Sequence, residues 1–232
     1  MDGSNMEIDK IFSESNLAKE LFDGLVIYDA SVPGIHIWHG EENGRYNKKF
    51  LFNQTDGWMS VVPCKFHQIV EHIIKKVNQY ESPFGKQKIG ALERIQVINS
   101  KFTSEKNHKG IHLFNFHIDR INTYKGILYC SNVTCRDGPF AVMELNGRED
   151  EIAEKLDFLE KCHAAGKDWR KIDTTFEAVH YNNVEGVAGD IVIVDGREPH
   201  RAGTVENRGC RKAIIFEFFT LENSTRYRDS IL

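Results

Sequence analysis

Two histidines and an aspartate, at His117-Ile118-Asp119 and His200, have the clearest capacity for chemistry in this sequence. Successive side chains of a β-strand point to opposite faces, so an His-x-Asp triplet presents an imidazole and a carboxylate on one face. Two imidazoles and one carboxylate on one side of an Fe(II) ion form a facial triad, which leaves positions open for a bidentate keto acid and for dioxygen. The pattern therefore predicts an iron site with ligands His117, Asp119 and His200.

The triplet is a weak signal by itself, because a strand histidine with a nearby capping carboxylate is a common structural arrangement. Residues 189–200 strengthen it: they comprise a turn, a four-residue apolar strand, a second turn and a histidine directly after Pro199. This order places His200 at the entrance to the last strand, 81 residues after Asp119. Asn115, on the same strand face as His117, is a candidate to fix the tautomer of that imidazole.

Arg211 lies eleven residues after His200 and begins an apolar strand. The far carboxylate of 2-oxoglutarate needs a buried, permanently charged partner, and a guanidinium satisfies it with two parallel hydrogen bonds. Arg208 is the alternative, although it lies in a turn-rich segment. We therefore expect Arg211 to bind the cosubstrate, and we expect Tyr129 and Thr204 to be polar contacts to it near the metal end of the barrel.

The elements that must position these residues follow from hydrophobic periodicity. Alternation with period two predicts strands at 92–98, 111–119, 126–133, 140–145, 176–181, 191–194 and 212–219. Amphipathic helices are predicted at 63–80 and 149–163, the second stopped by Gly166. Before them we expect a short helix ending at Gly24, a strand at 25–28, and loops with short strands over 33–59.

Many short strands joined by turns favour a sandwich or jelly roll. We predict a mainly β protein with flanking helices, namely a cupin-like double-stranded β-helix. It should form one domain over residues 1–232, in which residues 1–90 are a helical and strand extension packed on a β-helix core at about 91–220.

Composition narrows the possible partners. The 30 lysines and arginines against 34 acidic residues give a net charge of -4, so no overall basic field favours nucleic acid. The 5 cysteines show no CxxC pair, which fits reduced thiols and a cytoplasmic location. The polar N-terminus and the absence of a long apolar run predict neither export nor membrane insertion. Oligomeric state leaves no signal in the sequence.

Several segments of the second half of the chain together resemble the phytanoyl-CoA dioxygenase family. They are His117-x-Asp119, Gly126-Ile-Leu-Tyr129-Cys-Ser-Asn-Val133, Asp137-Gly138-Pro139-Phe140, Gly189-Asp190-Ile-Val-Ile, and His200 followed by Arg211. The resemblance covers roughly residues 90 to 220. It implies a double-stranded β-helix that binds Fe(II), 2-oxoglutarate and O2, releases succinate and carbon dioxide, and oxidises a substrate C–H bond.

The chain also departs from the family pattern. Family members often carry tryptophan where Phe116 and Cys130 stand, and a P-G-S-H segment where this chain has residues 143–147. These differences bear on the substrate more than on the metal. Halogenating relatives lack the metal carboxylate, whereas Asp119 is present, so the resemblance favours hydroxylation of a small-molecule or carrier-linked substrate.

Two other functions are compatible with parts of the pattern. A non-catalytic jelly-roll protein could hold a ligand at the barrel mouth, and a zinc hydrolase could use the same ligands without oxygen and without a role for Arg211. Other histidine pairs, His36-x-x-His39 and His108-x-x-x-His112, lack strand or helix periodicity and are read as surface residues. Trp38 and Trp58 are read as packing residues or, if functional, as the lining of the mouth.

Overall fold

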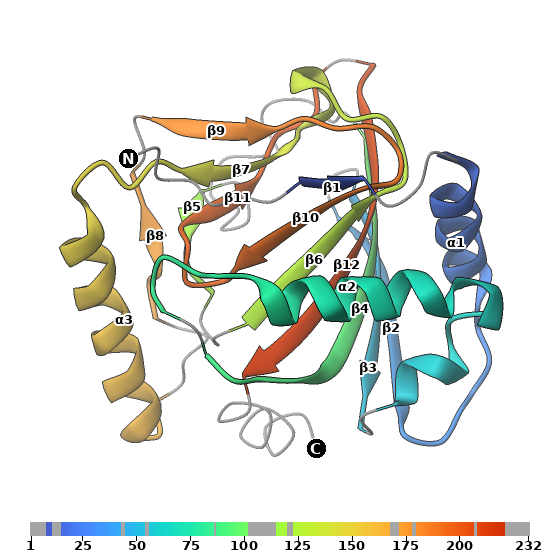
Figure 1. Ribbon diagram of the computed structural model, residues 1–232, viewed down its shortest axis with the longest axis horizontal. Helices are drawn as coiled ribbons and strands as arrows, with labels where there is room; N and C mark the ends of the chain where they lie inside the picture. Colours follow the sequence, from blue (N-terminus) through green and yellow to red (C-terminus); the bar gives the residue numbers. More distant parts are fainter. Residues whose placement is uncertain are drawn as a thin grey trace.

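Two antiparallel sheets face each other in the computed structural model (Figure 1). The structure describes residues 8–10, 15–42, 45–53, 56–85, 87–101, 115–119, 123–167, 172–177, 180–206 and 208–220. The larger sheet has seven strands. In order of pairing they are β1 (Ile8–Lys10), β10 (Asp190–Asp195), β6 (Thr123–Tyr129), β12 (Cys210–Thr220), β4 (Ile89–Lys101), β3 (Arg45–Phe52) and β2 (Ile35–Glu42).

The smaller sheet has five strands and carries the predicted histidine ligands. In order of pairing its strands are β8 (Thr175–Phe176), β5 (Phe116–His117), β11 (His200–Ala202), β7 (Phe140–Met143) and β9 (Tyr181–Val184). In this half the chain passes repeatedly between the sheets, since β4, β6, β10 and β12 lie in the larger sheet and β5, β7, β8, β9 and β11 in the smaller one. The predicted jelly roll is confirmed.

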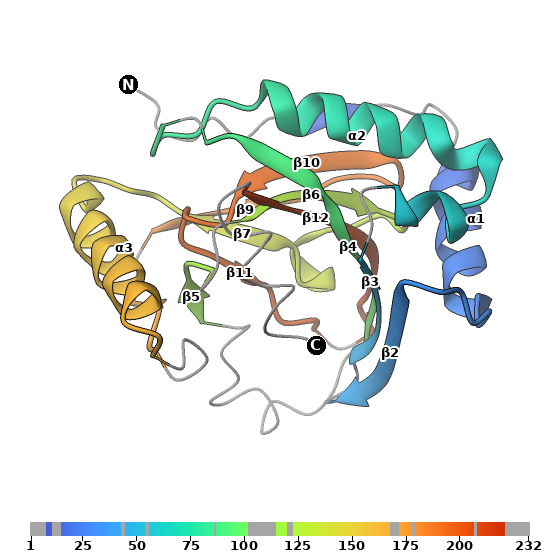
Figure 2. The same cartoon turned by 90° about the horizontal axis from the view of Figure 1, so that it is seen from below.

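Three α-helices among the described residues flank the sheets. They are α1 (Ser15–Ile27), α2 (His67–Gln79), which follows a 3-10 turn at Cys64–Phe66, and α3 (Glu149–Ala164). Helix α2 lies over the outer face of the larger sheet, on the side opposite to the smaller sheet, and α3 lies beside the smaller sheet (Figures 1 and 2). A Cβ built on Gly126 would lie 2.4 Å from Cγ2 of Ile73, so glycine on β6 allows α2 to pack closely. No helix in the described ranges is both long and apolar enough to span a membrane.

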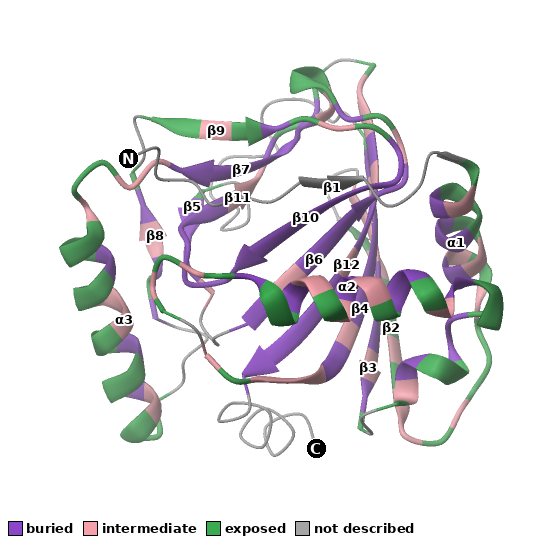
Figure 3. Ribbon diagram, viewed as in Figure 1, coloured by how far each residue is buried: buried purple, intermediate pink, exposed green. Residues whose placement is uncertain are grey.

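Buried residues make up most of the central strands of both sheets (Figure 3). The apolar ones form separate clusters around the two sheets. The largest cluster joins α1 and α2 to the outer face of the larger sheet, and another joins α3 to the outer face of the smaller sheet. The third, which includes Ile127, Val142 and Val194, lies between the sheets. Polar ligand residues also face this interior space, so the outer layers supply much of the hydrophobic stabilisation.

The first part of the chain differs from the prediction in two places. The strand predicted at 25–28 is wrong, because Leu25 belongs to α1 and shares a buried helical stripe with Ala18 and Leu21. An apolar run of four residues is too short to show a strand or helix period. Whether it forms a strand or a helix therefore depends on the helical turns that precede it. The irregular structure predicted for 33–59 is also wrong in extent, because β2 and β3 pair over eight residues each and extend the larger sheet.

Strand boundaries in the second part shift for identifiable reasons. Of the strand predicted at 111–119, only Phe116–His117 is regular among the described residues, and residues 102–114 lie outside them. The segment predicted as one strand at 176–181 instead includes the end of β8 and the start of β9. These two strands form the opposite edges of the smaller sheet. Gly166 has φ +65° and follows α3, as predicted.

Candidate metal centre

Strand pairing brings the three predicted metal ligands together. His117 ends β5 and His200 begins β11, and the two residues are direct partners in the smaller sheet. Their ring centroids are 4.7 Å apart, and Asp119 follows two residues after His117. One nitrogen from each ring and one oxygen of Asp119 lie within 4.8 Å of one another. Nε2 of His200 lies 3.6 Å from Oδ1 of Asp119, a separation that two ligands of a single ion at about 2.0 to 2.2 Å can have.

Backbone carbonyls fix the tautomer of both imidazoles. Nδ1 of His117 lies 2.8 Å from the carbonyl oxygen of Asn115, and Nδ1 of His200 lies 2.7 Å from that of Glu198. A carbonyl only accepts hydrogen bonds, so each Nδ1 donates and each Nε2 keeps its lone pair for a metal. Asn115 thus acts at the predicted place but through its backbone, and the residue is exposed.

Asp119 is held from three directions. Its backbone N–H donates to the carbonyl of Gly196 at 2.7 Å, and the Thr123 hydroxyl donates to Oδ2 at 2.6 Å. The Lys125 ammonium donates to Oδ1 at 2.9 Å. A Cβ on Gly196 would lie 2.1 Å from Oδ2 of Asp119, so only glycine leaves room for the carboxylate in this position.

The electrostatics of the centre favour a cation at the shared position. The Lys125 ammonium donates to Nε2 of His200 at 3.0 Å as well as to Asp119, so the same acceptors already attract a positive group. Burial alone would raise the pKa of Asp119, but Lys125 and the two histidines hold it well below its usual range. Burial, helped by Lys125, holds the pKa of His200 well below its usual value, which keeps the imidazole neutral. These groups fit a divalent metal.

The centre opens into a cavity of about 200 Å³ between the sheets. Every second residue of β3, β4, β6 and β12 faces it from the larger sheet, as the pleat requires. The charged residues on this wall are Arg45, Lys49, Arg94, Lys125, Arg211 and Glu217. The cavity therefore suits anionic ligands.

Arg211 lies in the same cavity as the triad. Its side chain is buried, and burial lowers its pKa, although Tyr129 and Asp137 oppose this shift. A guanidinium remains charged under such a shift. Arg208, the alternative, is exposed, has φ +70° and does not line the cavity.

The two further residues predicted to contact a cosubstrate differ in position. Tyr129 lines the cavity, and its hydroxyl donates to the carbonyl of Val184 at 2.7 Å and accepts from the N–H of Phe140 at 3.3 Å. These bonds tie the larger sheet to the smaller one beside Arg211. Thr204 is exposed and is not among the residues that line the cavity.

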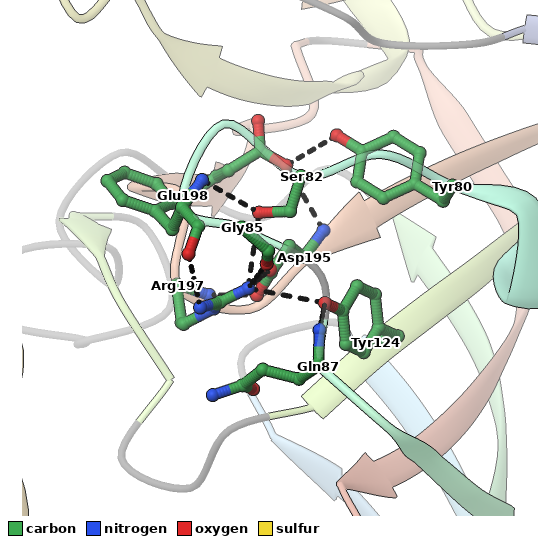
Figure 4. A network of polar contacts seen from close by, with 9 residues as sticks. Tyr80, Ser82, Gly85, Gln87, Tyr124, Asp195, Arg197 and Glu198 are labelled. Carbon is green, nitrogen blue, oxygen red and sulfur yellow. Dashed lines mark hydrogen bonds and ion pairs between the residues drawn. The ribbon is translucent and has the colours of Figure 1, made fainter.

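A buried polar network supports the turn that presents His200 (Figure 4). Arg197 donates to Asp195 at 2.6 Å and to the carbonyl of Gly85 at 2.6 Å. The Tyr80 hydroxyl donates to Glu198 at 2.6 Å. Burial raises the pKa of Glu198 to about 7. The network fixes the loop after α2 to the segment whose Glu198 carbonyl orients His200.

Sequence reasoning missed Thr123, Lys125 and Gly196. The strand predicted at 126–133 begins at Thr123, so extending its alternation backwards from Tyr129 reaches both Lys125 and Thr123 on the cavity face. That periodicity was the available signal. His36 and His39 are exposed, as expected, whereas His108 and His112 lie outside the described residues.

Several solved structures share this fold. HygX from Streptomyces hygroscopicus, solved with nickel, 2-oxoglutarate and hygromycin B bound, matches with a TM-score of 0.51 and 13% identity over 95% of this chain and 84% of that chain. The carbocyclase SnoK from nogalamycin biosynthesis, described as non-haem and α-ketoglutarate-dependent, matches with a TM-score of 0.52 and 12% identity over 96% and 86%.

A prolyl hydroxylase in complex with a hypoxia-inducible-factor peptide fragment, from Trichoplax adhaerens, has a TM-score of 0.55 and 11% identity over 97% of this chain and 87% of that chain. No protein-family model and no curated protein sequence matches the chain. Identities this low establish the shared fold alone. The resemblance to the phytanoyl-CoA dioxygenase family stays a prediction.

Proposed function

We propose that this chain is an Fe(II)- and 2-oxoglutarate-dependent oxygenase that hydroxylates a small-molecule or carrier-linked substrate and releases succinate and carbon dioxide. His117, Asp119 and His200 would hold the metal. The observation that carries the proposal is the convergence of their ligand atoms within 4.8 Å, at the wall of a cavity that also contains the buried Arg211. The bound ligands of HygX support the same assignment.

The chain's own residues supply positioning and charge. The backbone carbonyls behind the two imidazoles hold both Nε2 lone pairs toward the metal position. Arg211 would bind the far carboxylate of 2-oxoglutarate, beside the Tyr129 ring, and so orient the keto acid toward the triad. The metal, when bound, supplies the activation of dioxygen for oxidation of a C–H bond, with the keto acid as reductant. The sheets around the cavity exclude bulk water from the reacting groups.

Anaerobic calorimetry of the full chain with Mn(II) and then 2-oxoglutarate tests the binding steps. We expect Arg211→Met to raise the Kd of 2-oxoglutarate about 100-fold, because truncating one partner of a buried charge pair costs about 2 to 5 kcal/mol. Mn(II) affinity should remain. Lys212→Gln is the matched control, since Lys212 is the next residue of β12 and lies against Phe22 on the opposite face.

Incubation with Fe(II), ascorbate, oxygen and 2-oxoglutarate tests the reaction. Succinate release that requires oxygen is the expected result. Tight binding of metal and 2-oxoglutarate without succinate would favour the non-catalytic jelly-roll protein instead. An unchanged 2-oxoglutarate affinity in Arg211→Met would show that the cosubstrate assignment is wrong.

A further inference from the structure

The cavity carries more positive charge than the proposed reaction needs. Five cationic side chains line it against two carboxylates, Asp119 and Glu217, which leaves a surplus of three positive charges in a chain whose net charge is -4. Fe(II) and the dianion of 2-oxoglutarate cancel each other, so binding both leaves the surplus unchanged. Buried charges require compensation by a partner of opposite sign.

Arg45 is the least compensated of these cations. Its Nε and Nη1 are buried and have no hydrogen-bond partner among the described residues. Burial, and after it the charge of Arg211, lower the pKa of Arg45 to about 10. The two arginines occupy one row of the sheet, since Ser100 of β4 pairs with both.

Lys49 extends the same cationic wall four residues further along β3. Burial lowers its pKa, and so does Arg94, although Glu217 opposes this effect. Arg94 forms an ion pair with Glu217, so that arginine is already compensated. Lys125 forms an ion pair with Asp119, and the proposed reaction assigns Arg211 to 2-oxoglutarate. Arg45 and Lys49 are therefore the cations of this wall that have neither an ion pair among the described residues nor a ligand in the proposed reaction.

An aromatic ring borders the wall at the surface. Trp38 of β2 pairs with Lys49, and the ammonium lies 5.2 Å from the ring centroid. The Trp38 side chain lies against Gly40, where a Cβ would be 3.1 Å from the ring, and the residue is 51% exposed. A ligand that reaches Lys49 from solvent would thus pass an exposed apolar surface.

We propose that Arg45 and Lys49 form a subsite for an anionic group, a phosphate, sulfate or carboxylate, carried by the primary substrate. The subsite is distinct from the Arg211 position, and its role in turnover rests on the proposed function. Trp38 contacts the part of the substrate next to the anion. The substrate class is therefore an anionic small molecule or an anionic carrier conjugate.

Thermal unfolding of the full chain loaded with Mn(II) and 2-oxoglutarate tests the subsite with simple anions. Phosphate, sulfate and acetate are each compared with chloride at equal ionic strength, and the three arms distinguish the anion types. An anion at a hundred times its Kd should raise Tm by roughly 5 to 10 °C. The double variant Arg45→Gln/Lys49→Gln should lose this rise, whereas Lys212→Gln should keep it, which separates the subsite from general salt effects.

Calorimetry on the same proteins shows whether Arg45 and Lys49 bind the substrate anion or 2-oxoglutarate. We expect the double variant to bind 2-oxoglutarate within about twofold of the parent affinity. A Tm rise that is equal in parent and double variant overturns the subsite. A 2-oxoglutarate affinity that falls as far as in Arg211→Met also overturns it, because the cations would then belong to the cosubstrate position.

The two proposals fail in different ways. If the parent chain binds no 2-oxoglutarate with Mn(II), the proposed function fails. The anion comparison on the chain without metal or cosubstrate then still decides whether Arg45 and Lys49 bind anions. Retained 2-oxoglutarate binding and succinate release without an anion response would remove the subsite alone.

Discussion

The two walls of the cavity are built on different principles. On the smaller sheet, His117 and His200 are short side chains oriented by backbone carbonyls, and Asp119 is fixed by a backbone N–H and a neighbouring hydroxyl. On the larger sheet, long cations such as Arg45 and Lys49 lie in a row. Burial lowers the pKa of both side chains, and the positive charges of neighbouring cations lower it further.

We call the wall on the smaller sheet the preorganised wall. The wall on the larger sheet is the cationic wall, whose charges lack an anionic partner before a ligand binds. Backbone contacts hold the first wall in one geometry before any ligand arrives, which suits metal coordination. Clustered like charges cost free energy in the free protein and are compensated when an anion binds. The predictions below test whether each wall behaves in this way.

Removing the carboxylate of the preorganised wall should have the largest effect. We expect Asp119→Ala to weaken Mn(II) binding on the order of 1,000-fold, which exceeds the 10- to 100-fold typical of lost outer hydrogen bonds. The variant removes the anionic ligand and also leaves the Lys125 ammonium facing the metal position without its partner. Calorimetry measures the affinity, and Asp23→Ala, a surface carboxylate on α1, is the control. Equal affinities in the two variants would exclude Asp119 as a ligand.

Breaking the polar network of Arg197 and Asp195 behind His200 should lower the free energy of unfolding, while the charges that line the cavity stay the same. Arg197→Met leaves Asp195, which is 0% exposed, without its cation. Breaking a buried ion pair on one side costs about 3 to 5 kcal/mol. Urea unfolding at neutral pH measures the loss. Adding Asp195→Asn to Arg197→Met should restore most of the stability, since no buried charge then remains. No recovery would mean that the hydrogen bonds that Arg197 donates to the carbonyls of Phe84 and Gly85 dominate.

The metal ligands of the preorganised wall, and Arg211 of the opposite wall, could be predicted from the sequence. The H-x-D triplet, Pro199 before His200, and the apolar strand after Arg211 each leave a local pattern, and the structure brings all four residues to one cavity. The jelly roll followed from many short strands with turns between them. Strand alternation predicts that His117 and Asp119 share a face, whereas His200 reaches them through the pairing of β11 with β5.

The cationic wall could not be predicted in the same way. In β3, Lys48 and Lys49 alternate between an apolar layer and the cavity, so both faces of the strand are covered and no polar-outward pattern remains. A single sequence does not distinguish a cation that faces a cavity from one that faces solvent. For the same reason, the sequence did not predict the pairing of β2 with β3. It also led to the prediction that Thr204 lies near the cosubstrate, although the residue is exposed.

A single methyl group should disturb the preorganised wall to a smaller degree. In Gly196→Ala the new Cβ would lie 2.1 Å from Oδ2 of Asp119 and 2.8 Å from the Thr123 hydroxyl, so the carboxylate must shift. We expect Mn(II) affinity to fall about 10- to 100-fold, as for other losses of ligand orientation. Gly24→Ala is the matched control, because its Cβ meets nothing within 4 Å and alanine favours the helix. An unchanged Mn(II) affinity would show that Asp119 tolerates displacement.

Lys125 belongs to the cationic wall but contacts the metal ligands of the preorganised wall. Its substitution therefore tests to which of the two walls the residue belongs by function. Its ammonium both supports Asp119 and places a positive charge beside the metal position. Two unit charges 4 Å apart near a protein surface interact by about 4 kcal/mol, whereas Thr123 and Gly196 still hold Asp119 when the lysine is removed. Repulsion should therefore win, and Lys125→Met should bind Mn(II) about 10-fold more tightly by calorimetry. Weaker binding would instead assign Lys125 to the preorganised wall as a positioning residue for Asp119.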